Sequence, residues 1–213
     1  MQEAKPEPDS AADALIRQAE AWHERMRELG DAAARRIAPT AVRDMARRLR
    51  LARLEDPELD DLCAMVLEDA VLHLARPGRT SPLDRLARDA RTADPETARA
   101  LAMMRGATLS FWRAERAGEP CGLVLRDLLA EREVLLVDER LDDTEGLIGT
   151  CLLARLAEVE GFWIAATLLT PIGQDQDSNE LAAILTTYGH NVREAGTPED
   201  FHRMALDAIR ASP

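Results

Sequence analysis

The chain has 213 residues, of which 46% are hydrophobic and 31% are charged. This length and apolar content allow a buried core and argue against a chain that is disordered throughout. The formal net charge of −12 at pH 7 opposes nonspecific binding to nucleic acid or to an anionic membrane surface.

Residues 1–9 are polar and contain two prolines, so we expect a disordered tail without the apolar core of a secretory signal. No apolar run reaches the roughly 18 residues that a membrane-spanning helix needs, which predicts no membrane association. The three cysteines are widely spaced within apolar runs, a pattern typical of buried, reduced thiols. Together these features predict a cytoplasmic protein.

Helix start and stop signals occupy residues 10–118. Ser10 is placed to cap one helix, and Asp56 and Asp94 each precede a proline, which is a common first residue of a helix. The helix that follows Asp94 is expected to continue to Gly118. Shorter helices are expected over 41–53 and 82–91. The sequence therefore predicts a helical region over 10–118.

Strand-like runs dominate residues 119–173. The runs 122–129 and 133–137 lie on either side of a short polar turn, which predicts a hairpin. A second hairpin is predicted from 150–156 and 162–169, because Gly161 between them can take the positive φ of a tight turn. We expect a small antiparallel β module of about four strands, since that number lets one apolar face be buried.

Helix signals return over residues 174–213. Ser178 precedes one predicted helix that ends at Gly189, and Thr197 with Pro198 begins another. The order of helices, strands and two C-terminal helices indicates an α+β fold rather than the alternating strands and helices of a parallel sheet.

Two Glu-x-x-His pairs, Glu20 with His23 and Glu199 with His202, have the spacing that places two metal ligands on one helix face. A carboxylate-bridged site would also need carboxylates from two further helices. Glu199 has a second explanation, because the helix dipole favours acidic residues in a first turn. A metalloprotein is therefore an alternative, and no cofactor is predicted.

Basic residues cluster between Arg35 and Arg53, where Asp44 is the only acidic residue. Arg43, Arg47 and Arg50 are expected on one helix face, which is a candidate for binding nucleic acid or an acidic partner. The alternative is that these arginines pair with acidic residues of the same protein, many of which lie in the strand region.

Phe162 and Trp163 are neighbours in a predicted strand, so their side chains should point to opposite sides. If one side chain enters the core, the other can anchor a partner, and Trp163 is the candidate. The sequence has no Gly-rich phosphate loop, no Gly-x-Ser-x-Gly elbow and no Cys-x-x-Cys pair. No catalytic residue is predicted.

Three segments, 125–129, 134–140 and 149–156, carry loose Asp-Leu-Leu, Asp-Glu-Arg and Ala-Arg-Leu patterns. In this order they resemble the strand-rich segment of uncharacterised bacterial proteins that often carry a SEC-C metal-binding motif. Residues 120–122 are similar to the start of that motif, but no paired cysteines follow at zinc-ligand spacing. The resemblance therefore implies a structural module and no zinc site.

These observations predict a non-catalytic cytosolic adaptor or accessory protein that binds another macromolecule, most simply a protein. The first alternative is a nucleic-acid-associated regulator that uses the basic segment Arg35–Arg53. The second is a metalloprotein built on the two Glu-x-x-His pairs. The sequence leaves the oligomeric state open.

Overall fold

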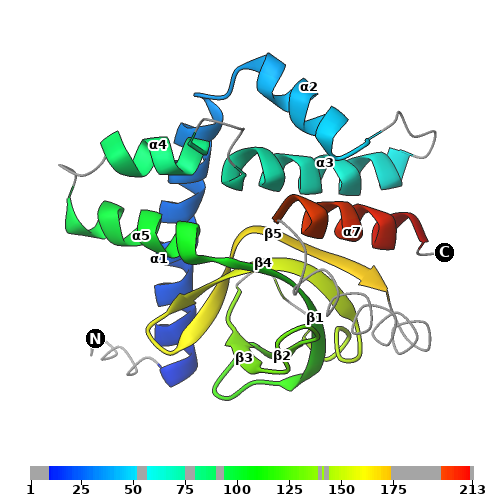
Figure 1. The fold of residues 1–213 in the computed structure, drawn as a ribbon. Helices are drawn as coiled ribbons and strands as arrows, with labels where there is room; N and C mark the ends of the chain where they lie inside the picture. Colours follow the sequence, from blue (N-terminus) through cyan, green and yellow to red (C-terminus); the bar gives the residue numbers. More distant parts are fainter. Residues whose placement is uncertain are drawn as a thin grey trace, which may run out of the picture.

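The computed structural model describes residues 10–51, 57–74, 80–89, 94–138, 141, 144–173 and 198–211. The described elements, in chain order, are α1 (Ala11–Ala34), α2 (Pro39–Arg48), α3 (Pro57–His73), α4 (Pro82–Asp89), α5 (Pro95–Gly106), β1 (Thr108–Ala117), β2 (Leu123–Asp127), β3 (Glu133–Leu136), β4 (Cys151–Val159), β5 (Phe162–Gly173) and α7 (Pro198–Ala211). The predicted α+β class is confirmed. Figure 1 shows the strands as one barrel, with helices along one side and above it.

The strands close into a barrel in the order β1-β2-β3-β5-β4. All neighbours pair antiparallel except β3 and β5, which run parallel where Leu136 lies opposite Trp163. Both predicted hairpins are confirmed, β2 with β3 and β4 with β5. The β4–β5 turn contains Glu160 at φ 46° and Gly161 at φ 100°, as the two-residue hairpin turn with two positive φ angles requires.

The predicted continuation of the helix after Asp94 to Gly118 is wrong, because β1 begins at Thr108 where a helix was expected. Helix α5 ends at Gly106, and the following strand buries Phe111 under the helices and Trp112 inside the barrel. A strand that is apolar on both faces cannot be told from a buried helix by periodicity. The module thus has five strands rather than four, and it is mixed rather than purely antiparallel.

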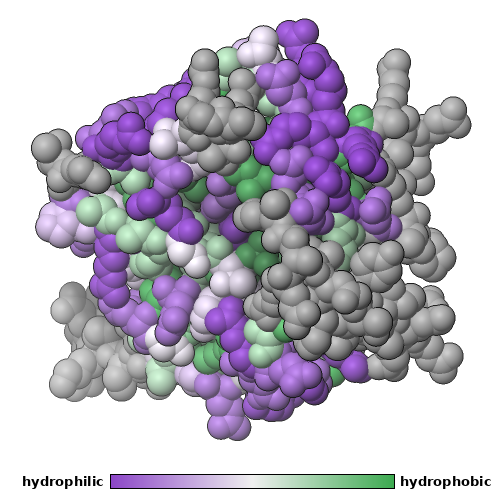
Figure 2. Space-filling model, in the orientation of Figure 1, coloured by the Kyte–Doolittle hydropathy of each residue, from purple (hydrophilic) through white to green (hydrophobic). Residues whose placement is uncertain are grey.

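The barrel interior is filled by one apolar cluster with members from all five strands. Its members with at most 2% exposure are Trp112, Ala114, Leu123, Leu125, Leu136, Leu152, Ala154 and Leu156. The outer face of β4 and β5 is covered by two further clusters, one with α1, α4 and α5 and the other with α2, α3 and α7. Among the coloured atoms in Figure 2, hydrophilic side chains dominate the helices at the top, and hydrophobic ones are visible mainly near the centre of the face.

Helix α1 begins as the sequence predicts, because Ser10 and Asp13 form a reciprocal capping box. The three buried residues Ala19, Met26 and Ala33 recur every seven positions and face the core. The final predicted helix is confirmed as α7. The predicted tail at 1–9 and the predicted helix near 179–188 lie outside the described residues. No described helix has the length and apolar content needed to cross a membrane.

Gly122, just before β2, lies very close to the backbone of β3. Its φ is +92°, and a Cβ atom there would lie 2.3 Å from the backbone oxygen of Leu136 on the neighbouring strand. Gly149 has a similar φ of +89°, but a Cβ atom there would meet nothing within 4 Å. A substitution at either glycine therefore places a side chain on a left-handed backbone, but only a substitution at Gly122 also causes steric overlap.

We expect Gly149→Ala to lower the free energy of unfolding by about 1–2 kcal/mol, the cost of a left-handed backbone for alanine. Gly122→Ala should cost a further 1–3 kcal/mol or so, because the new methyl group overpacks against β3. Urea unfolding monitored by tryptophan fluorescence measures both values. Equal losses in the two variants would contradict the close approach of Gly122 to Leu136.

Candidate functional site

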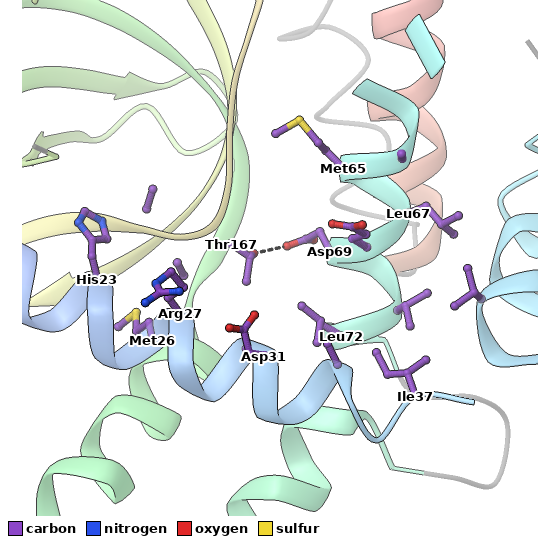
Figure 3. A pocket seen from close by; sticks show the side chains of 18 of the residues that line it. His23, Met26, Arg27, Asp31, Ile37, Met65, Leu67, Asp69, Leu72 and Thr167 are labelled. Atoms are coloured by element: carbon purple, nitrogen blue, oxygen red, sulfur yellow. Dashed lines mark hydrogen bonds between the residues drawn. The ribbon is translucent and has the colours of Figure 1, made fainter. Parts of the chain in front are cut away.

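A pocket of about 1290 Å³ lies between α1 and α3, with β5 beneath it and the start of α2 at one end. Figure 3 shows α1 along one side and α3 along the other, with Thr167 of β5 between them. We call this pocket the groove. The three elements that form its sides and floor contribute side chains of different character.

Helix α1 supplies a polar wall. Its residues that line the groove recur every three or four positions and so lie on one helix face. They include Glu20, His23, Glu24, Arg27 and Asp31. The buried stripe of the same helix lies beside this polar stripe, and one of its members, Met26, also lines the groove.

Helix α3 supplies a mainly apolar wall, which includes Ala64, Met65, Val71 and Leu72. Met65 is 36% exposed, and Val42 at the α2 end of the groove is 38% exposed. Among the described residues, only Ile148 is another large hydrophobic side chain with comparable exposure. Most of the large exposed apolar side chains in the described chain therefore border the groove.

The floor is a short irregular stretch of β5 formed by Ala165, Ala166 and Thr167. The register between β4 and β5 shifts here, so that several β5 residues lie opposite Arg155 alone. A bulge of this kind changes the direction in which strand side chains point. The two alanines leave the space above the strand open, and Thr167 reaches toward α3.

Asp69 of α3 lies at the edge of the groove and is 2% exposed. Arg155 of β4 donates two hydrogen bonds of 2.7 Å to its two carboxylate oxygens. Thr167 donates to one of these oxygens, and His202 Nε2 of α7 lies 2.9 Å from the other. Arg155 also donates to the backbone oxygen of Ala107 at 3.1 Å. This network joins two helices to two strands of the barrel.

The surroundings of the network lower the pKa values of two groups, Asp69 and His73. Burial by itself raises the pKa of Asp69, but the Arg155 guanidinium and the His202 hydrogen bond outweigh it and hold that pKa well below its usual range. Burial and the nearby Arg155 charge lower the pKa of His73 to about 3. His73 Nε2 is 3.7 Å from Asp69 and has no hydrogen-bond partner among the described residues.

The two Glu-x-x-His pairs are held in different surroundings. Glu20 and His23 line the groove, and His23 Nε2 is 3.8 Å from Asp138. His202 is buried against Asp69, whereas Glu199 pairs with Arg48 and Arg203. Within the described residues, no group of three or more His, Cys, Asp or Glu side chains is arranged to hold a metal ion.

The basic segment does not form the continuous helix face that the sequence predicted. Helix α2 ends at Arg48, and Arg50 follows it with a φ of 56°, outside the helix. Arg43 borders the groove, and Arg47 is 79% exposed, 3.5 Å from Asp44. The three arginines are exposed, but they do not share one helix surface.

Among the residues that the structure describes, acidic side chains of other helices pair with this basic segment. Arg36 contacts Asp89 of α4 at 2.5 Å. Arg48 donates to Glu199 of α7. These contacts fit the alternative that some of the arginines pair within the protein, although with different acidic partners from those expected.

Trp163 lies toward the barrel interior, and Phe162 is buried under the helices on the other side. Arg132 lies over the Trp163 ring, with its guanidinium carbon 4.7 Å from the ring centroid. Trp112 packs against the same ring, with the two ring centroids 6.3 Å apart. The two neighbours therefore face opposite sides, as the strand alternation predicts. The proposed role of Trp163 in partner binding stays a prediction.

Four residues of the groove and its buried network were sequence candidates, namely Glu20, His23, Arg43 and His202, but their shared location was not predicted. Asp69, Met65 and Thr167 were missed. Asp69 had one visible signal, because the residues three positions before and after it in the predicted helix, Val66 and Leu72, are apolar and lie on the same helix face. A carboxylate in that position either reaches solvent or requires a buried cationic partner. Met65 and Thr167 had no signal, because nothing local indicates that the two segments meet.

Comparisons with protein-family models, with curated proteins and with solved structures found no match. The resemblance to the SEC-C-associated module therefore stays a prediction. What the site does has to be inferred from its geometry and charge.

Asp69→Ala is expected to lower the free energy of unfolding by about 3–5 kcal/mol, because it leaves Arg155 buried without its carboxylate. The matched control is Arg36→Ala, which breaks an ion pair whose side chains are 45% and 63% exposed. We expect the control to change stability by less than about 1 kcal/mol. Urea unfolding measures both, and similar losses would contradict a structural role for the buried pair.

Stability should also fall as the pH decreases from about 6.5 toward 3. In this range the unfolded chain protonates His73 while the folded protein keeps it neutral, so unfolding takes up a proton and stability rises with pH. The slope due to His73 is at most about 1.4 kcal/mol per pH unit. His73→Leu should flatten the profile measured by urea unfolding between pH 6.5 and 4.5, and an unchanged slope would contradict the lowered pKa.

Proposed function

We propose that this protein is a non-catalytic cytosolic accessory protein that binds a segment of another protein in the groove between α1 and α3. The observation that carries the proposal is the coincidence of an open groove with exposed Met65 and Val42 at its edge. Large exposed apolar side chains that gather at a concave surface are typical of interaction sites. Methionine suits such a surface because its flexible side chain adapts to a partner.

The size of the groove supports a peptide segment as the ligand. An α-helix is about 10–12 Å across and rises 5.4 Å per turn, so two turns occupy on the order of 1000 Å³. Most small-molecule pockets span about 300–1,000 Å³. At about 1290 Å³ and open on one side, the groove has room for a short helical or extended segment.

The hydrogen bonds and the lowered pKa of Asp69 support a non-catalytic role. Each oxygen of Asp69 has two hydrogen-bond contacts, which come from Arg155, His202 and Thr167. A carboxylate held in this way, with its pKa far below neutral, is a poor general base. Its role is to hold α3 against the barrel rather than to transfer protons.

The cytosolic part of the proposal is supported by the cysteines. All three are thiols rather than members of disulfides, and Cys63 and Cys151 are buried. Buried thiols are typical of proteins in a reducing compartment.

Nucleic-acid binding is the less favoured alternative. Arg43, Arg47 and Arg50 are exposed and could contact phosphates. However, Arg43 borders a groove rimmed by Glu20, Glu24, Asp31 and Glu68, and Arg47 lies beside Asp44. These carboxylates would repel a phosphate backbone.

The groove can be tested by placing a photo-crosslinking amino acid at Ala64, which lines it and is exposed. In a lysate of the source organism we expect a defined crosslinked protein. The double substitution Val42→Glu with Met65→Glu should reduce its yield about tenfold or more, the equivalent of about 1.4 kcal/mol of lost binding. Quantitative mass spectrometry of the crosslinked products measures the yield.

Ile148→Glu is the matched control, because Ile148 is 47% exposed and lies outside the groove. It should leave the crosslinked yield unchanged. All these variants alter exposed positions, so they should keep the stability of the parent protein within about 0.5 kcal/mol. A yield that falls equally in both variants, or in neither, would show that the groove is not the binding site.

A further inference from the structure

More acidic than basic side chains border the groove. Four exposed carboxylates border it, Glu20, Glu24 and Asp31 on α1 and Glu68 on α3. Two arginines border it as well. Arg27 and Glu24 pair with each other at 2.6 Å, so this pair adds no net charge, and three carboxylates remain against Arg43. Arg43 lies on α2, at the end of the groove. The long side of the groove formed by α1 therefore presents an excess of negative charge.

The opposite wall has a different chemistry. Met65 and Leu72 of α3 line the groove, and Val42 of α2 adds exposed apolar surface at its end. A ligand between the two walls meets carboxylates on one side and aliphatic or thioether groups on the other. Two acidic residues of α3 depart from this pattern: Asp69 is buried and paired with Arg155, whereas Glu68 is exposed and adds to the negative charge.

We infer that the segment bound in the groove is a basic amphipathic helix of a partner protein. This inference rests on the proposed function and adds the chemistry of the ligand. The apolar stripe of the partner helix packs against α3, and its lysine or arginine side chains face the carboxylates of α1. This arrangement matches both walls at once, because an amphipathic helix carries its polar and apolar residues on different faces.

The spacing of the α1 carboxylates constrains the partner further. Glu20 and Glu24 are four residues apart on α1, and Asp31 lies seven residues beyond Glu24. At a rise of 1.5 Å per residue, these positions span about 16 Å along the axis, or three helical turns. A partner helix that lies alongside α1 therefore needs basic residues over about three turns of one face, with spacings near four and seven.

The apolar and charged walls contribute differently to binding. Contacts with Met65, Leu72 and Val42 remove apolar surface from water and supply most of the affinity. The carboxylates remain partly solvated, so their pairing with basic residues mainly selects the charge of the partner and raises the association rate. Preference for charge, rather than affinity alone, is therefore the property to measure.

Two synthetic peptides of about 20 residues, long enough to form helix in isolation, provide the probe. Both carry the same apolar stripe; one has lysines and the other glutamates at the four- and seven-residue spacings. Fluorescence anisotropy with the full chain should show that the lysine peptide binds about tenfold or more tightly. The difference should shrink as the salt concentration rises, because exposed charges are screened.

The double substitution Glu20→Lys with Asp31→Lys should reverse this preference, so that the glutamate peptide binds more tightly. The matched control is Glu28→Lys with Glu145→Lys, which makes the same change in net charge at exposed positions outside the groove. The control should keep the preference for the lysine peptide. If the control changes the peptide preference as much as the groove variant does, the preference depends on the overall charge of the protein and not on the groove. That result would overturn the inference.

Equal binding of the two peptides, a preference for the glutamate peptide, or binding of neither would overturn the inference about charge. These outcomes leave the proposed function to its own test, since loss of the crosslinked protein in the Val42→Glu and Met65→Glu variant does not depend on the partner's charge. Concentration-dependent dimerisation that Met65→Glu abolishes would also overturn the inference, because a second copy of the chain would then fill the groove.

Discussion

The buried ion pair between Asp69 and Arg155 is the contact on which the helical layer over the barrel depends. A carboxylate at 2% exposure is tolerated only if its hydrogen bonds are satisfied, and Arg155 satisfies both oxygens. Because Arg155 belongs to β4 and Asp69 to α3, this pair fixes where α3 lies on the barrel. His202 extends the same constraint to α7, because its Nε2 lies 2.9 Å from a carboxylate oxygen of Asp69.

The groove is a consequence of how β5 departs from regular pairing. Up to Ala165 the strand alternates between the barrel interior and the helical layer, and then the register with β4 shifts opposite Arg155. The irregular stretch combines two alanines, which fill little space, with Thr167, whose hydroxyl reaches Asp69. The same local irregularity therefore leaves the floor of the groove open and completes the network that holds α3 beside it.

Helix α1 has two stripes with separate roles, and this division explains the character of the groove. One stripe, at Ala19, Met26 and Ala33, anchors the helix to the core, and Met26 of this stripe also reaches the groove. The polar stripe that includes Glu20 and Asp31 is left facing the groove and gives it negative charge. The basic segment that looked like the natural binding surface is partly engaged within the protein instead, since Arg36 and Arg48 pair with acidic residues of α4 and α7.

The sequence by itself determined the α+β class, both hairpins and the first and last described helices, because capping residues, turn glycines and apolar periodicity act over a few residues. It did not determine β1, since Phe111 and Trp112 are apolar on both faces and local pattern does not separate such a strand from a buried helix. Only the tertiary structure decided that Asp69 meets Arg155 across 86 positions of sequence and that Met65 borders the same groove as Glu20. Those contacts depend on how the chain closes the barrel, and no residue carries a local signal for a partner that far away.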